Sequence, residues 1–215
     1  MTVAETAFAA IDFESAGLRP GGTEVPVQIG IAPMQGGEIS PHEFFGSFLA
    51  TDQEITWSAR KVHGITRRDL ADAPDLTALW PQIKNRLAGR WLIAHGAATE
   101  KRFLRAFPFH GFGPWVDTLK LSRAVWPARE SFALGDLIRA LDLEHELRAL
   151  YPDFRWHDAL SDAVASLVLL RRIVAETGIA EEEGAILLRA DDSPYHRQKR
   201  KSEGAAGASR PTNPD

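Results

Sequence analysis

The chain has 215 residues, of which 44% are hydrophobic and 25% are charged, a composition typical of one globular core with room for an appendage. The absence of cysteine excludes disulfides and cysteine-ligated zinc sites. A net charge of −4 does not favour nucleic-acid binding by the molecule as a whole, although carboxylates held around metal ions would raise the acidic count without repelling a polyanion.

The first half of the chain is predicted to contain four strands. Residues 6–13 form an apolar run, and 26–34 and 44–50 supply two more strands separated by Gly- and Pro-bearing turns, so these three are expected to form a meander. A polar, helix-rich region follows over about 56–88. The segment WLIAH, residues 91–95, then indicates a short buried strand.

The second half of the chain alternates between strand and helix. A helix over about 97–106 is followed by a fifth strand at 114–118. Further helices are expected near 118–125, 133–142, 144–150 and 158–176. A hairpin series followed by strand–helix alternation predicts an α/β fold, in which a five-stranded mixed sheet has helices on both faces.

One main domain is expected over residues 1–178, followed by a short helix over 179–190. From 191 to 215 the residues are mainly Ser, Gly, Ala, Pro and charged types, which predicts a disordered tail. The first ten residues lack the Lys or Arg of a signal peptide, and the late apolar run AVASLVLL is far shorter than the ~20 residues that span a membrane. We therefore expect a cytoplasmic protein without a membrane partner.

Two carboxylates stand at the end of the first predicted strand. Asp12 and Glu14 follow the apolar run AFAAI, and the alternation of side chains along a strand places both on one face. Two like charges on a covered face raise each other's pKa and are costly unless something compensates them. The simpler alternative is that the strand has ended and both side chains face water.

The same pattern recurs on two predicted helices. Helical periodicity counted back from Leu169 places Asp162 on the inward face, and Glu100 likewise precedes two apolar residues by three and four positions. Four carboxylates at the ends of apolar faces, on three different elements, indicate a shared cation. Hard oxygen ligands of this kind suit Mg²⁺ or Mn²⁺.

His157 stands five residues before Asp162, at or just before the start of the predicted helix. A loop imidazole beside a metal-binding carboxylate can accept a proton from water near neutral pH. A surface histidine is the alternative, which the neighbouring carboxylates make the less favoured interpretation. The His-Asp pair at 157–158 also occurs in metal phosphohydrolases, but these need further helical histidines, which the rest of the chain does not supply.

Five segments carry a resemblance to a known family. The segments AIDFESAGL, VHGIT, AHGAATEKRFL, VDTLKLSR and HDALSDAVAS occur in the order seen in the DnaQ-like 3′–5′ exonucleases, over about residues 6–175. The final His-x-x-x-x-Asp resembles that of the DEDDh branch of this superfamily. The resemblance implies a ribonuclease H-like fold.

The resemblance also implies a role for each candidate residue. Asp12 would bridge two divalent ions, Mg²⁺ or Mn²⁺, while Glu14 and Asp162 would hold one of them. Glu100 would bind the other ion, largely through water, and His157 would be the general base. The pocket for the terminal nucleotide would be lined by the backbone and side chains of Phe13, Ser15 and Ala16, together with His63.

Three positions depart from the family's pattern. Glu100 replaces an aspartate, which keeps the charge and adds one methylene, roughly 1.5 Å of reach. Ser15 and Ala16 replace two threonines, which removes one hydroxyl from the expected nucleotide pocket. Phe13 is also a candidate wedge between bases.

One tryptophan and the basic residues allow two interpretations each. Trp57 is a candidate for stacking on a base, although packing in the core is the favoured interpretation. The basic clusters at 60–61 and 67–68 are more typical of a solvated surface than of a binding site. The tail segment HRQKRK would either add backbone affinity or keep a disordered end in solution.

The function predicted from these residues is removal of nucleoside 5′-monophosphates from the 3′ end of single-stranded DNA or RNA. A DNA polymerase or another repair component is a candidate partner. One alternative is a nucleic-acid-binding or polymerase-accessory module in which Glu100 has weakened or abolished catalysis. Another is an enzyme restricted to short oligoribonucleotides. The sequence does not decide between DNA and RNA.

Overall fold

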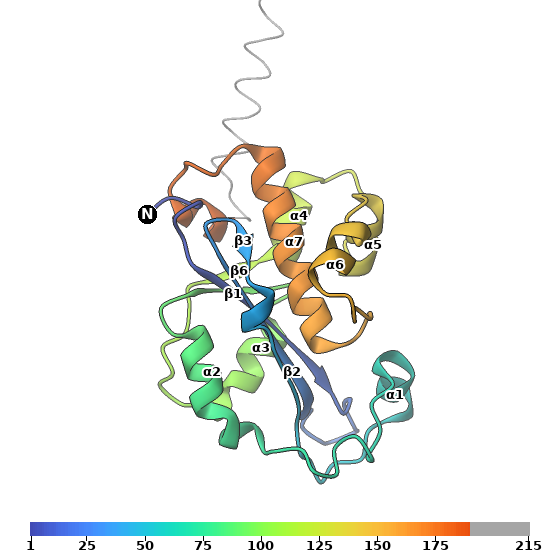
Figure 1. Ribbon diagram of the computed structural model, residues 1–215. Helices are drawn as coiled ribbons and strands as arrows, with labels where there is room; N and C mark the ends of the chain where they lie inside the picture. Colours follow the sequence, from blue (N-terminus) through green and yellow to red (C-terminus); the bar gives the residue numbers. More distant parts are fainter. Residues whose placement is uncertain (190–215) are drawn as a thin grey trace, which may run out of the picture.

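A mixed sheet lies at the centre of the computed structural model, which describes residues 1–189 (Figure 1). The tail predicted at 191–215 lies outside these residues. The strands run in the order β3-β2-β1-β5-β6, and β4 also pairs with β2. Their bounds are β1 Phe8–Ser15, β2 Pro26–Gln35, β3 Glu38–Ile39, β4 Phe45–Phe48, β5 Trp91–Ala94 and β6 Trp115–Asp117.

The pairing of the strands confirms the predicted architecture. Strand β2 is antiparallel to β1, β3 and β4, whereas β5 is parallel to β1 and β6 is parallel to β5. The predicted meander therefore corresponds to β1, β2 and β4. The two-residue strand β3 was not predicted, because a segment this short carries no alternation of apolar and polar residues.

Helices cover both faces of the sheet (Figure 1). They are α1 Trp57–His63, α2 Trp80–Leu87, α3 Ala98–Phe103, α4 Thr118–Val125, α5 Leu134–Ala140, α6 Glu144–Leu150 and α7 Ala159–Thr177. Short 3₁₀ turns lie at Pro41–Glu43, Leu76–Leu79, Leu104–Ala106 and Gly184–Leu188. The helix predicted over 97–106 is thus divided into α3 and a 3₁₀ turn, and much of the region 56–88 is loop.

Two hydrophobic cores lie on opposite sides of the sheet, and the alternation along β1 separates them. Phe8 and Ala10 face the core built on α7, whereas Ala9, Ile11 and Phe13 face the core that includes α2 and α3. Helix α7 is buried on nearly every side, because α4, α5 and α6 pack against it from outside the sheet. Within residues 1–189, no helix combines the length and the apolar character needed to cross a bilayer.

Candidate active site

Asp12 and Glu14 lie within β1 rather than after it. The strand continues to Ser15, and neither carboxylate is an exposed residue, so the alternative that the strand had ended in water is wrong. The alternation that turns Phe8 and Ala10 toward α7 also turns these two carboxylates toward that helix. The strand therefore presents both acids to the first turn of α7.

A glycine on the neighbouring strand lets α7 come close enough to complete this arrangement. Gly30 of β2 is the pairing partner of Asp12. A Cβ atom at Gly30 would lie 2.2 Å from the backbone of Ala159 and Leu160, so any other residue would push the helix away. Because Asp162 lies in the first turn of α7, this close approach fixes its height above the sheet.

Gln28 holds the start of α7 to the sheet. Its Nε2 donates to Asp158 Oδ2 at 2.6 Å, and its Oε1 accepts from the Ala159 amide at 3.1 Å. The Gln28 side chain is buried, and Asp158 itself caps α7 by accepting from the Ser161 amide. One side chain of β2 therefore fixes the residues on the C-terminal side of His157.

We expect Gln28→Met to reduce kcat by roughly 10- to 100-fold with little change in KM, because the variant loses both bonds that position the loop carrying His157. Steady-state kinetics on a labelled oligonucleotide checks this expectation. Gln35→Met, at the exposed end of the same strand, is the matched control and should retain wild-type kinetics. A kcat for Gln28→Met within twofold of the wild type would contradict a positioning role.

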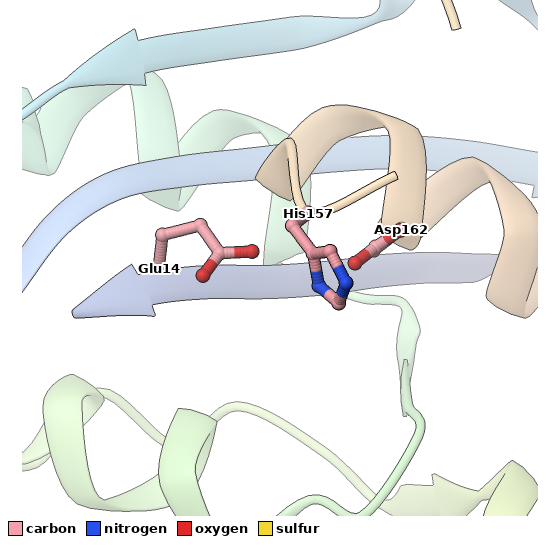
Figure 2. A group of neighbouring side chains, drawn as sticks. All are labelled: Glu14, His157 and Asp162. Carbon is pink, nitrogen blue, oxygen red and sulfur yellow. The ribbon is translucent and has the colours of Figure 1, made fainter. Parts of the chain in front are cut away.

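His157 lies on the loop directly before α7, with its backbone at a φ of +60°. This left-handed conformation is uncommon for a residue with a Cβ and persists where the surroundings enforce it. Ligand atoms of Glu14, His157 and Asp162 all lie within 4.8 Å of one another. Figure 2 shows these three side chains converging from β1, the loop and α7.

Glu100 approaches the same cluster from α3. It is 5% exposed, and its charge contributes to raising the pKa of Asp12. Asp117, at the end of β6, accepts hydrogen bonds from the amides of Gly96 and Ala97 and also caps α4. Asp117 thereby holds the turn that leads into α3 and positions Glu100.

The carboxylates have pKa values far from their ordinary range. Burial, followed by the charges of Asp162, Glu100 and the other nearby acids, raises the pKa of Asp12 well above its usual value. Burial and then Asp162 raise the pKa of Glu14 to about 8. Burial is also the main reason that the pKa values of Glu100 and Asp162 rise to about 7. In the absence of cations the cluster therefore retains protons near neutral pH.

The donor set fits divalent cations. Glu100 Oε2 and Asp162 Oδ1 are buried, and neither has a hydrogen-bond partner among residues 1–189. Buried carboxylate oxygens without a partner are costly, and cations would supply that partner. Oxygen donors from Asp12, Glu14, Glu100 and Asp162 are of the type that Mg²⁺ and Mn²⁺ prefer.

Two of the residues predicted to line a nucleotide pocket have side chains that are buried in the hydrophobic cores. Phe13 packs into the core against Phe103, with ring centroids 5.3 Å apart, so its predicted role as a wedge is wrong. The alternation of the strand, which turns Asp12 toward α7, necessarily turns Phe13 to the other face. The Ala16 side chain is fully buried in a small core with Val27, which leaves only its backbone available.

Ser15 and His63 lie beside the cluster and are already engaged. The Ser15 hydroxyl donates to Glu24 at 2.6 Å, and Glu24 also pairs with Arg102 of α3. His63 Nδ1 accepts from the Ile65 amide, so its Nε2 carries the proton and donates to the Ser15 carbonyl at 3.0 Å. Burial lowers the pKa of His63, which agrees with a neutral ring.

Four residues of this site were not identified from the sequence patterns. Gln28, Gly30, Glu24 and Asp117 each act through a contact with a distant segment, such as the 130 positions between Gln28 and Asp158. The motif VDT did contain Asp117, but its spacing does not say what the side chain binds. The prediction that Trp57 packs in the core is also wrong, because this residue is 76% exposed.

The chain matches known proteins over most of its length. A family model described as an exonuclease, RNase_T, matches residues 9–170. The chain is 30% identical over 176 residues to a DNA polymerase III PolC-type protein of Thermotoga maritima, a match that covers 79% of this chain and 12% of that protein. It is 27% identical over 175 residues to exodeoxyribonuclease 10 of Escherichia coli K12, which covers 81% of this chain and 72% of that protein.

A solved structure matches over nearly its whole length. Exonuclease X in complex with 5′ overhanging duplex DNA is 26% identical to this chain, with a TM-score of 0.68. The match covers 84% of this chain and 98% of that chain. The match thus covers nearly all of that structure but only a small part of the PolC-type relative.

Proposed function

The chain belongs to the exonuclease family, and we propose that it is a metal-dependent 3′–5′ exonuclease of the DEDDh type. The resemblance carried by the five sequence segments is confirmed, as is the ribonuclease H-like fold. The substrate we propose is the 3′ end of single-stranded DNA, and the products are nucleoside 5′-monophosphates. The names of two relatives, an exodeoxyribonuclease and an exonuclease bound to DNA, support DNA over RNA.

The observation that carries this proposal is the convergence of buried carboxylates beside one imidazole. Ligand atoms of Glu14, Asp162 and His157 come within 4.8 Å of one another, although Glu14 lies more than 140 positions from the other two in the sequence. The electrostatic cost of this arrangement is evident in the raised pKa values of the carboxylates. A fold retains such a costly cluster when charge compensation by cations is part of its function.

In the proposed mechanism each side chain has one task. Divalent cations, when bound, would activate water and neutralise charge on the scissile phosphodiester. Asp12, Glu14, Glu100 and Asp162 would hold the cations. His157 stands on the rim beside Glu14 and Asp162, where its imidazole accepts a proton from the attacking water. The bonds from Gln28 to Asp158 and Ala159 hold the residues next to His157 and so position the base.

The test is a hydrolysis assay on end-labelled single-stranded DNA and RNA of matched sequence, with Mg²⁺, Mn²⁺ or a chelator. We expect mononucleotide release only with a cation, and faster release from DNA than from RNA. Glu100→Gln should lose roughly 10- to 100-fold in rate, whereas Glu100→Asp should stay active because the charge is kept. Binding of DNA without any release of mononucleotides would instead favour the nucleic-acid-binding module.

A polymerase partner is the second part of this proposal. The PolC-type relative is named as a DNA polymerase, and this chain matches 12% of its length. We propose that the chain acts on 3′ ends made available by a polymerase or by a repair reaction. Sedimentation of the chain with a replicative polymerase, in the presence and absence of a primed template, tests this association.

A further inference from the structure

We propose that the surface of α1 binds the single strand upstream of its terminal nucleotide, an inference that rests on the proposed function. We call this the α1 surface, and it consists of Trp57, Arg60 and Lys61 of the helix together with Arg67 and Arg68 of the turn that follows. In the proposal Trp57 stacks on an upstream base while the cationic side chains contact the phosphates.

The first observation is the exposure of Trp57. The indole is 76% exposed, whereas tryptophan is normally among the more buried residues. None of the side chains of residues 57–63, all of which the structure describes, is buried. Figure 1 shows α1 standing apart from the helices that cover the two faces of the sheet. Helix α1 therefore contributes little to the core, and its outer surface is free to act in binding.

The second observation is that α1 is fixed to the end of β1 that carries Glu14. The Thr56 amide donates to the Ala16 carbonyl at 2.8 Å, and His63 Nε2 donates to the Ser15 carbonyl at 3.0 Å. A Cβ atom at Gly17 would lie 2.2 Å from Thr56 Oγ1, so the helix start sits directly on the chain after Glu14. The α1 surface is thus held beside the carboxylate cluster.

Both ends of α1 are capped, so the exposed tryptophan belongs to a regular helix. Thr56 caps the start by accepting from the Ala59 amide, and Gly64 ends the helix in the left-handed conformation. A cavity of about 330 Å³ beside the last turn is lined by His63 and by His157. The last residue of α1 and the proposed base therefore border the same cavity.

The third observation is the charge around Trp57. Lys61 lies over the indole, with its ammonium 5.2 Å from the ring centroid. Arg60, Arg67 and Arg68 are exposed, and within residues 1–189 none of the four cationic side chains forms an ion pair within 4 Å of a carboxylate. This concentration of positive charge contrasts with the net charge of −4 of the whole chain.

Two acidic residues near α1 in the sequence already have partners. Glu54 pairs with Arg19 at 2.6 Å, and Asp69 accepts hydrogen bonds from the amide and hydroxyl of Thr66. Bonds with Arg19 and Thr66 are the main reasons that the pKa values of Glu54 and Asp69 are lowered, and the charges of Arg67 and Arg68 contribute less. Positive charge on the α1 surface therefore remains available to a polyanion.

An aromatic ring surrounded by cations matches both the bases and the phosphates of single-stranded nucleic acid. Bases stack on aromatic side chains with little dependence on sequence, and Lys and Arg neutralise the backbone between them. A protein partner would require a larger apolar surface than one indole among four cations. A strand whose 3′ end lies at the carboxylate cluster has α1 directly beside it.

The test compares Trp57→Ala with Trp57→Phe on a single-stranded 12-mer and on a dinucleotide. We expect Trp57→Ala to raise KM for the 12-mer by roughly 10- to 100-fold, with kcat and the kinetics on the dinucleotide unchanged. Trp57→Phe should keep most of the affinity, because a phenyl ring still stacks. Phe109→Ala, which alters another exposed aromatic residue, is the matched control and should behave as the wild type.

A binding measurement separates this inference from the proposed function. Anisotropy of a labelled 12-mer in the presence of a chelator reports binding without hydrolysis, and Trp57→Ala should weaken it by the same factor. Lys61→Gln should weaken binding less and reduce the slope of log affinity against log salt by about 0.7. Failure of the wild type to hydrolyse DNA would overturn the proposed function alone. Unchanged binding and KM in Trp57→Ala, or equal losses on the dinucleotide, would overturn the role of the α1 surface.

Discussion

Asp12→Asn is expected to abolish hydrolysis, with kcat reduced by about 10³-fold or more, and to stabilise the metal-free protein at pH 8. Asparagine has the same shape as aspartate but carries no charge, so the variant removes a cation ligand without creating a cavity. Burial, and after it the charges of Asp162, Glu100 and Glu14, raise the pKa of Asp12 well above its usual value. Asparagine therefore avoids the cost of burying or protonating this carboxyl on folding, while the loss of this cation ligand prevents catalysis.

The stability effect depends on pH in a defined direction. The pKa of Glu14 is about 8 and that of Asp162 is about 7 in the folded protein, whereas unfolded carboxylates titrate near pH 4. Between about pH 4 and pH 8 the native state consequently binds more protons than the unfolded state. Stability of the metal-free protein falls as pH rises through this window.

Thermal unfolding measured at pH 5 and pH 8 checks this expectation. The melting temperature of the metal-free wild type should be lower at pH 8 than at pH 5. Both Asp12→Asn and added Mn²⁺ should change this fall in melting temperature. The variant should reduce the fall by removing a carboxyl that takes up a proton on folding, and the cation should reduce it by binding the ionised carboxylates. Asp72→Asn, at an exposed position, should change neither activity nor stability.

The outcome that would contradict the assignment is near-normal turnover in Asp12→Asn. Such a variant would show that the cluster does not hold the catalytic cations, whatever its stability. A variant that is inactive and no more stable than the wild type at pH 8 would instead contradict the electrostatic argument. Activity and stability thus test two separate statements about the same side chain.

The parts of the fold that could be predicted are those whose signal is local. The helices α4 and α6 match their predicted bounds of 118–125 and 144–150, because the apolar periodicity is complete within each segment. Asp12 and Asp162 were recognised in the same way, as charges placed on otherwise apolar faces. Strand and helix periods are enough to tell which face a residue occupies.

The contacts that hold the site together could not be predicted, because they join distant segments. No local pattern says that Gln28 reaches Asp158, or that Gly30 is the point where α7 touches β2. The error at Phe13 has a different cause, since the strand period already placed this residue on the face opposite Asp12. A role carried over from a family motif was there given more weight than the alternation of side chains.

The error at Trp57 shows the limit of arguments from residue type. Tryptophan is buried in most proteins, and that tendency favoured packing. The helix that carries Trp57 is anchored through its backbone and through Thr56 and His63, so it needs no apolar contact from the tryptophan. Whether a side chain is buried depends on how its element is held, and this is a property of the tertiary structure.

His157→Ala is expected to reduce kcat by roughly 10²- to 10⁴-fold while the protein still binds cations. The imidazole would be the proton acceptor, whereas the cations are held by the carboxylates, so the two properties should separate. Because His157 has a φ of +60°, His157→Asn is the better second variant, since asparagine tolerates this conformation more readily than alanine. His42→Ala, at an exposed position, is the matched control.

The geometry of the cluster allows His157 two roles, and His157→Ala distinguishes them. An imidazole nitrogen within 4.8 Å of the ligand atoms of Glu14 and Asp162 is close enough to act as a base or to bind a cation directly. For a base, the rise in melting temperature with increasing Mn²⁺ should follow the wild-type curve while kcat falls. For a ligand, the curve should shift to higher Mn²⁺ and excess cation should restore part of the rate. The preference of Mg²⁺ and Mn²⁺ for oxygen over nitrogen donors, together with the four carboxylates already present, favours the base.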